Sequence, residues 1–412
     1  MKKTFLFLLL TMSMLAVTSC RQDEPQKKSK VTFTTTLDNF EEEYQITDLH
    51  VTFKEINTGQ SYEATQKDGN LGVEVPYGLY DIDAKGTIKY MVNDKELRTA
   101  IVATRKNEAI NSAECKLDLK FTFAEKPEPG DGDIRSLVIA EIFPSGTQTE
   151  NGDKYVGDQY FRIYNNSNKV VYADGLLILE SSFNTTLVQD IEPRITETCF
   201  PVQAVYMVPG SGKDVPVQPG GYLTICDQAT DHTKINRNSI DLSGADFEWF
   251  DETPANSKVK DVDNPAKNLD KIYCYTRTIW ALHDRGGSSY AIAKMETTKD
   301  DYLAKYKKKY VWKYKMPDGS VKNIDRDTYY IPTNWVIDGV NLSILNVEKW
   351  LVMPTSLDRG FTYVSTIDRD PQRYGKSVVR KTGAMKKGVT QLVDTNNSTD
   401  DFIHQSKATL LK

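Results

Sequence analysis

The sequence predicts a mainly β protein built from two β-sandwich domains. Short runs in which apolar and polar residues alternate recur through residues 31–124, with turn-forming residues between them about every 8–12 residues, as in antiparallel sandwiches. Apolar runs that are typical of buried strands recur from residue 134 onward. A segment rich in proline and charge separates the two regions. We therefore expect a spacer domain, a linker and a larger second domain.

The first domain is predicted over residues 31–124. Successive side chains of a strand point to opposite faces, so each alternating run has one apolar face to pack on a partner sheet. The runs are 31–33, 49–53, 73–75, 80–82 and 117–123, and the turns between them fall at 57–59, 67–70 and 76–78. A small antiparallel sandwich is the fold that this pattern favours.

The linker is predicted over residues 125–133, whose sequence is EKPEPGDGD. Prolines and charges keep such a segment extended, and it has no apolar side chains to bury. Its Asp-Gly-Asp lacks the further oxygen ligands of an EF-hand loop, so a linker is favoured over a calcium site.

The second domain is predicted over residues 134–412. It opens with the apolar run 137–143, followed by the aromatic strand 159–167 and the apolar strand 170–179, with a tight Asn-Asn-Ser turn between the last two. Residues 297–333 form an insertion between the strand-like segments of this domain.

The insertion is predicted to begin with a short helix over residues 300–309. Thr298 is placed as its N-cap, and Tyr302, Tyr306 and Tyr310 would lie on one face at the helical spacing i, i+4, i+8. Trp312, Tyr314 and a hairpin turn at 317–319 follow.

The same insertion alternates aromatic residues with lysines. We predict that Tyr306, Tyr310, Trp312 and Tyr314 contribute to a contact with a ligand or a partner. The alternative is that the aromatic face packs on the sandwich and the lysines are solvated. The lysines are Lys305, Lys307, Lys308, Lys309, Lys313 and Lys315.

The charge balance argues against a nucleic-acid-binding protein. The chain has 52 basic and 57 acidic residues and a net charge of −5, whereas phosphate recognition requires an excess of Lys and Arg. The four histidines are far apart and no HExxH motif occurs, so we expect neither an enzyme nor a cofactor. A hydrolase would require a cleft in which carboxylates or His283 converge.

Four cysteines lie beyond the N-terminal segment: Cys115, Cys199, Cys226 and Cys274. Their long spacings exclude the CxxC pattern of zinc and redox sites. Buried free thiols and disulfides both remain open. If one disulfide forms, we expect it to join two of Cys199, Cys226 and Cys274.

Two acidic stretches, 261–264 and 394–401, carry the clustered oxygens that a calcium ion requires. Asn, Asp and Ser are also the ordinary residues of turns, and we favour loops at both places. No metal site is therefore predicted.

The N-terminal segment is predicted to be an export signal. Residues 1–19 combine a charged start, a short apolar run and small residues before Cys20, which resembles the lipobox of bacterial lipoproteins. The apolar run is shorter than the roughly 20 residues that a transmembrane helix needs. The resemblance implies that Cys20 is lipidated and that residues 20–30 tether the protein to membrane lipid.

Asp23 and Glu24 follow that cysteine closely and resemble the acidic surface-export signal of Bacteroidetes lipoproteins. The resemblance implies an outer-membrane protein that faces the cell exterior. A charged flexible tether without such a signal, on a protein that faces the periplasm, is the alternative.

Further motifs resemble an uncharacterised Bacteroidetes lipoprotein family, domain of unknown function 4876, with a lamin-tail-like core. The resemblance covers roughly residues 137–402 and rests on AEI (140–142), YFRIYNNS (160–167), YADG (172–175), PGGYLTI (219–225), residues 239–249 and GKSVVRK (375–381). The first domain, through 72–82, is similar to the transthyretin-like sandwiches attached to carboxypeptidases. Both resemblances imply immunoglobulin-like or transthyretin-like sandwiches, and neither supplies a catalytic residue.

Together these observations predict a non-enzymatic binding protein on the cell surface. By analogy with similar lipoproteins, we expect it to assist a TonB-dependent outer-membrane transporter in nutrient capture. An adhesive or structural surface protein is the alternative, and a hydrolase is the third possibility.

Overall fold

The computed structural model describes residues 26–37, 43–65, 72–92, 95–124, 129–130, 132–276, 278–316 and 318–412. The predicted signal, Cys20, Asp23, Glu24, most of the linker, the turn at 67–70 and the first residue of the turn at 317–319 lie outside these ranges. Within them, no helix is long and apolar enough to cross a membrane.

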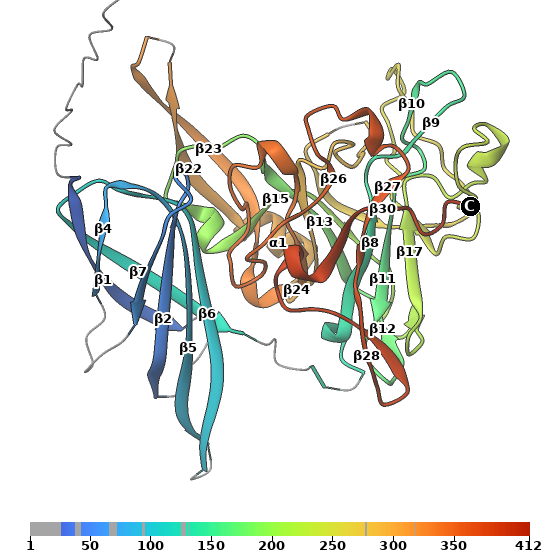
Figure 1. Ribbon diagram of the computed structural model, residues 1–412. Coiled ribbons are helices and arrows are strands. Elements are labelled where there is room, and N and C mark those ends of the chain that lie inside the picture. The colour runs from blue at the N-terminus through green and yellow to red at the C-terminus, as the bar shows by residue number, and fades with distance from the viewer. Residues whose placement is uncertain are drawn as a thin grey trace, which may run out of the picture.

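The first domain is a seven-stranded sheet in the order β3-β2-β5-β6-β7-β1-β4, seen on the left of Figure 1. Its strands are β1 (Lys28–Leu37), β2 (Tyr44–Glu55), β3 (Ser61–Thr65), β4 (Gly72–Pro76), β5 (Gly78–Val92), β6 (Lys95–Ile110) and β7 (Glu114–Phe123).

This sheet folds over on itself around one apolar core. The β3-β2-β5-β6 half joins the β7-β1-β4 half through only two residue pairs between β6 and β7, and the outer strands β3 and β4 contact each other. In β2, alternate residues Leu49, Val51 and Phe53 are buried in the core, as the alternation predicts.

The second domain packs two large sheets face to face. The first has the order β19-β18-β17-β11-β8-β27-β30 and the second β14-β22-β23-β15-β13-β21-β24, with β20 beside β15. The first contains β8 (Leu137–Phe143), β11 (Tyr160–Asn165), β17 (Tyr222–Cys226), β18 (Phe247–Glu248), β19 (Lys267–Asn268), β27 (Lys376–Arg380) and β30 (Phe402–Lys407). The second contains β13 (Leu176–Asn184), β14 (Ile191–Glu192), β15 (Cys199–Met207), β20 (Asp270–Cys274), β21 (Ser288–Lys294), β22 (Lys307–Lys315), β23 (Val321–Pro332) and β24 (Val336–Val340).

Short elements complete the domain. The two-residue to five-residue strands are β9 (Thr147–Gln148), β10 (Lys154–Tyr155), β12 (Val171–Tyr172), β16 (Pro216–Val217), β25 (Leu342–Ile344), β26 (Thr362–Ser365), β28 (Thr382–Lys386) and β29 (Val389–Leu392). The helices are α1 (Lys299–Lys305) and α2 (Ser398–Asp401), and the 3-10 helices are η1 (Ile134–Ser136), η2 (Ile195–Glu197), η3 (His232–Lys234), η4 (Thr333–Trp335), η5 (Leu345–Val347) and η6 (Pro371–Arg373). The prediction of a mainly β protein is confirmed.

The core between the two sheets is rich in aromatic side chains whose polar tips are satisfied. Trp280 stacks on Tyr206 with ring centroids 4.7 Å apart, and its indole N–H donates to the Glu180 carboxylate at 2.6 Å. Trp249 packs beside Trp280 and donates to its backbone carbonyl. Large aromatic rings can fill a core in this way because each N–H or O–H has an acceptor.

The insertion differs from its prediction. Thr298 caps α1 as expected, with its hydroxyl accepting from the Asp301 N–H at 3.2 Å, but the helix ends at Lys305 rather than at Lys309. From Lys307 the chain is the strand β22, which pairs with β23 along its whole length. The predicted continuation of the helix was wrong because alternation within 307–315 allows a long hairpin, in which every residue gains a cross-strand partner.

The four cysteines Cys115, Cys199, Cys226 and Cys274 are free thiols in the structure. The sequence left free thiols and disulfides as alternatives, and the structure shows free thiols. Burial raises the pKa of the Cys199 and Cys226 thiols, as expected of unreactive core cysteines.

Candidate functional site

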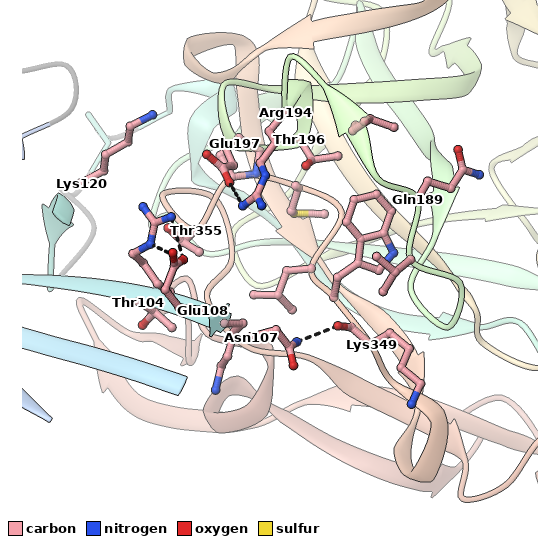
Figure 2. Close-up of a pocket in the computed structure, with 18 of the residues that line it drawn as sticks. Thr104, Asn107, Glu108, Lys120, Gln189, Arg194, Thr196, Glu197, Lys349 and Thr355 are labelled. Carbon is pink, nitrogen blue, oxygen red and sulfur yellow. Dashed lines mark hydrogen bonds and ion pairs between the residues drawn. The ribbon is translucent and has the colours of Figure 1, made fainter. Parts of the chain in front are cut away.

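A hollow of about 690 Å³ lies where the two domains meet. Figure 2 shows that its lining comes from both domains. The first domain contributes residues 104–108 of β6 with parts of β5 and β7, and the second contributes the loops 188–197 and 349–356. We call this hollow the interdomain pocket.

A bulge in β6 shapes the first wall of the pocket. The pairing with β5 passes from Tyr80↔Glu108 to Ile82↔Arg105, so β6 carries an extra residue here. Asn107 has a φ of +55°, a conformation that asparagine tolerates better than most residues. Asp81 holds the bulge by accepting from the Asn107 N–H at 3.2 Å and pairing with the Lys106 ammonium at 2.9 Å.

The bulge aims Asn107 at the second domain. Its amide N–H donates to the Lys349 carbonyl at 2.8 Å, a contact drawn in Figure 2. Bulges commonly redirect a side chain beside a functional site. Nearby, burial raises the pKa of the Glu348 carboxyl, and the positive charge of Lys106 partly opposes that shift.

The opposite wall is built around Trp350. Its indole N–H donates to the Asn184 carbonyl at 2.8 Å, and its ring packs edge to face on Phe183 with centroids 5.4 Å apart. The Lys349 N–H donates to the Thr185 carbonyl at 2.9 Å, which ties the loop to the end of β13. The apolar side chains on this wall are Val188, Ile191, Trp350, Leu351, Met353 and Pro354.

Charges of both signs surround this apolar surface. Arg105 pairs with Glu108 at 2.8 Å, and Arg194 pairs with Glu197 at 3.3 Å. The basic lining residues are Arg105, Lys106, Lys120, Arg194 and Lys349, and the acidic ones are Glu108, Asp118, Asp190 and Glu197. The two signs nearly balance, so the pocket does not present a strongly charged surface to a ligand.

The residues that the sequence singled out in the insertion lie elsewhere. Tyr306 packs against Trp335, with centroids 4.8 Å apart, and Tyr310 packs edge to face on Phe183 at 5.6 Å. Trp312 and Tyr314 contact each other farther along β22. None of Tyr306, Tyr310, Trp312 and Tyr314 lines the interdomain pocket.

The two acidic stretches are occupied by protein contacts. Asp261 accepts from the backbone N–H groups of Asp251 and Val262 at 2.8 and 2.9 Å. Asp401 accepts from the Thr395 N–H and hydroxyl and pairs with Arg380 at 3.5 Å. In the part of the chain that the structure describes, no group of three or more His, Cys, Asp or Glu side chains is arranged to hold a metal ion.

A second hollow, of about 500 Å³, lies on the second domain between β10 and η6. Its cations are engaged by carboxylates: Arg373 pairs with Asp284 at 3.0 Å, and Arg285 pairs with Asp368 at 2.6 Å. The interdomain pocket combines more apolar surface with a larger volume and is the stronger candidate site.

Sequence reasoning missed the interdomain pocket because its lining residues, from Leu79 to Ser356, are separated by up to 277 positions. The local signals were an asparagine within the alternating strand of β6 and a tryptophan between polar and apolar runs in 346–354. Neither signal indicates by itself which residues face it across a domain junction.

Comparison with known proteins supports the family resemblance. Residues 218–409 match the profile of the family described as "Protein of unknown function (DUF4876)". No curated protein matches the chain.

A solved structure shares the fold of this chain, and another overlaps it only weakly. A DUF4876 family protein from Bacteroides thetaiotaomicron VPI-5482 is 22% identical, with a TM-score of 0.54 over 93% of this chain and 96% of that one, which shows a shared fold. A candidate cell adhesion protein from Bacteroides eggerthii DSM 20697 overlaps 74% of this chain and 83% of its own at 8% identity, with a TM-score of 0.15 that is too low to indicate a common fold. The match over residues 218–409 supports the resemblance of this chain to the DUF4876 family.

Proposed function

We propose that this protein is a non-enzymatic, lipid-anchored protein of the outer membrane surface that binds a ligand in the interdomain pocket. The observation that carries the proposal is the pocket itself, an apolar wall around Trp350 in the second domain faced by polar groups of the first domain. Its volume of about 690 Å³ lies within the range of small-molecule sites, which are mostly apolar with a few polar groups that orient the ligand.

The lining supports a neutral ligand with both apolar and polar faces, and we propose an oligosaccharide. Trp350 offers an aromatic ring held in place by its own hydrogen bond, so little side-chain freedom is lost on binding. The Gln189 amide, labelled in Figure 2, and the hydroxyls of Thr196 and Thr355 offer donors and acceptors for hydroxyl groups, and the Thr104 hydroxyl, which donates to Asp83, offers an acceptor. The balanced charges of the rim disfavour a strongly ionic ligand.

The N-terminal sequence supports a location for this binding at the outer membrane surface. The lipobox-like segment ending at Cys20 supports a lipid anchor, and Asp23 and Glu24 support display on the outer face. A surface protein that captures a saccharide would serve a TonB-dependent transporter, and we propose that role for this chain.

The ligand is tested with a panel of neutral oligosaccharides on an array, followed by titration calorimetry with the saccharide that binds. Trp350→Ala is expected to weaken binding by about 10–100-fold, because buried aromatic residues dominate binding energies. Lys120→Glu changes the rim of the pocket and is expected to have a smaller effect. Lys116→Glu, four residues earlier on β7 and outside the pocket, is the matched control. A panel without any bound saccharide, or equal binding by Trp350→Ala and the wild type, contradicts the proposed site.

The role is tested by affinity purification of the tagged lipoprotein from its native outer membrane, followed by mass spectrometry. Stoichiometric recovery of a TonB-dependent barrel is the expected result. Recovery of the lipoprotein alone contradicts the transporter role and favours an adhesive or structural protein.

A further inference from the structure

The β22–β23 hairpin extends out of the second domain. Residues 329–332 of β23 pair with β15, and Val311 and Trp312 of β22 pair with β14, while the register from Lys307↔Tyr329 to Lys315↔Val321 continues past both contacts. Figure 1 shows the hairpin projecting beyond the body of the molecule. Gly319, with a φ of +86°, lies in the turn at its tip.

The outer part of the hairpin has an aromatic face and a basic face. On one face, Trp312 lies opposite Ile324 and Tyr314 lies opposite Lys322. On the other face, Lys313 and Lys315 lie opposite Asn323 and Val321.

Apolar side chains at the tip are open to solvent. The exposed fractions are 40% for Tyr314, 36% for Met316 and 60% for Val321. Tyr314 lies opposite Lys322 on one face of the hairpin, Val321 lies opposite Lys315 on the other face, and Met316 follows Lys315 at the turn. Exposed apolar groups ringed by lysines are a common feature of surfaces that contact lipid headgroups.

The hairpin is basic although the protein is acidic. Residues 307–327 contain six lysines, one arginine and three aspartates, a net charge of +4 in a chain of net charge −5. Lys307 pairs with Asp327 at 3.5 Å and Lys313 with Glu192 at 3.8 Å. In the described structure Lys315 and Lys322 form no salt bridge, so the positive charge is least compensated at the tip.

The direction in which the hairpin projects indicates which surface its tip would contact. In Figure 1, β1 begins at Lys28 near the upper end of the first domain, and the hairpin points toward that same end. Lys28 lies eight positions after Cys20, and a chain of that length spans at most about 28 Å. If Cys20 carries the lipid anchor, as the proposed function requires, the membrane surface lies on the side toward which the hairpin projects.

We propose that the tip of the β22–β23 hairpin is a second membrane contact. Tyr314, Met316 and Val321 enter the headgroup region of the lipid surface, while Lys313, Lys315 and Lys322 bind lipid phosphates. Tyrosine suits this position because it presents an apolar ring with a polar tip, and lysine extends an apolar stem with its charge at the headgroups. Contact at the hairpin together with the anchor at Cys20 would fix the orientation of the interdomain pocket relative to the membrane.

The experiment uses the mature chain, residues 20–412, with Cys20→Ser, so that no acyl chain contributes to binding. Co-sedimentation is measured with vesicles of phosphatidylethanolamine and phosphatidylglycerol in equal parts, and with vesicles of phosphatidylcholine alone. The wild type is expected to bind the anionic vesicles, and the Lys313→Glu/Lys315→Glu/Lys322→Glu variant is expected to bind them at least about tenfold more weakly. The Tyr314→Ser/Val321→Ser variant is expected to weaken binding while keeping the salt dependence.

The matched control is Lys258→Glu/Lys260→Glu with Val259→Ser, two exposed lysines around an exposed valine in the loop between β18 and β19, which belong to the other large sheet. It is expected to bind vesicles as the wild type does. Circular dichroism checks that each variant is folded. Absence of wild-type binding to the anionic vesicles, or an equal loss in the control and hairpin variants, overturns the proposal.

Depth of contact is measured with brominated lipids in a Tyr314→Trp variant, because Trp312 packs against the cluster around Phe183 and pairs with β14. Quenching that is stronger in Tyr314→Trp than in the wild type places the hairpin at the lipid surface, and equal quenching in both overturns the proposal. Saccharide binding by Trp350 is measured in solution without vesicles, so failure of the membrane contact and failure of the proposed pocket give different results.

Discussion

The two domains bury polar groups in different ways. The core of the first domain consists of apolar side chains such as Phe53, Ile82 and Phe121. The second domain buries more ionisable groups than the first, including Arg380, Asp338 and Glu180, inside or beside its sheets. An apolar core depends mainly on packed area, whereas buried charges depend on every partner being present and on pH. The second domain should therefore be the more sensitive to single substitutions of charged residues and to proton uptake.

The largest expected effect comes from Arg380, whose side chain is 1% exposed. It pairs with Asp338, Asp394 and Asp401 and donates to the Ile139 carbonyl at 2.7 Å. Arg380→Ala leaves buried carboxylates without a cation and is expected to lower the free energy of unfolding of the second domain by about 3–5 kcal/mol. Urea denaturation followed by tryptophan fluorescence measures this, since all five tryptophans lie in that domain.

The control for this comparison is Arg105→Ala in the first domain. Arg105 pairs with Glu108 at 2.8 Å, but both side chains are partly exposed, so we expect a loss of about 1 kcal/mol or less. Losses of equal size in the two variants would contradict the difference between the domains.

The domains are also expected to respond to pH in opposite directions. Burial raises the pKa of Glu180 to about 7 and that of Asp358 to about 7, and it raises the pKa of Asp227 well above its ordinary value. The folded second domain thus holds protons that the unfolded chain releases above a pH of about 4. Its free energy of unfolding is expected to fall as pH rises from about 4 to 7, by about 2–3 kcal/mol for each such group.

In the first domain, hydrogen bonds from Thr58 lower the pKa of Glu55 to about 2. The stability that this carboxylate contributes is present above a pH of about 4 and is lost as pH falls toward 2. Denaturant titrations of the two domains at a series of pH values measure both slopes, and Glu180→Gln should flatten the slope of the second domain. A free energy of unfolding of the second domain that does not change between pH 4 and 7 would contradict this expectation.

The smallest effect is expected at the junction between the domains. Asn107→Gly keeps the positive φ of the β6 bulge but removes the hydrogen bond to the Lys349 carbonyl. We expect the free energy that couples the unfolding of the two domains to fall by about 0.5–1.5 kcal/mol, with little change in the stability of either domain alone. Hydrogen exchange at the 346–356 loop measures the loosening. Unchanged protection in that loop would show that the contact does not hold the domains together.

The sequence predicted strands better than it predicted the site. The alternation in 49–53 and 117–123 corresponds to segments of β2 and β7, because period-two burial is a local property of one strand. The spacing of Tyr302, Tyr306 and Tyr310 favoured a helix to Lys309, yet only Tyr302 lies in α1, and Tyr310 lies in β22. The competing hairpin depends on residues 321–332, which the local spacing does not include.

The mainly β class, the cap at Thr298 and the hairpin turn before Val321 were determined by the sequence itself, since they depend on neighbouring residues and on backbone preferences. Only the tertiary structure decided that Asn107 meets the loop of Trp350 to form a pocket, and that the four cysteines remain thiols. Those outcomes depend on which surfaces the two sandwiches bring together, and contacts between residues hundreds of positions apart leave no periodic signal in the chain.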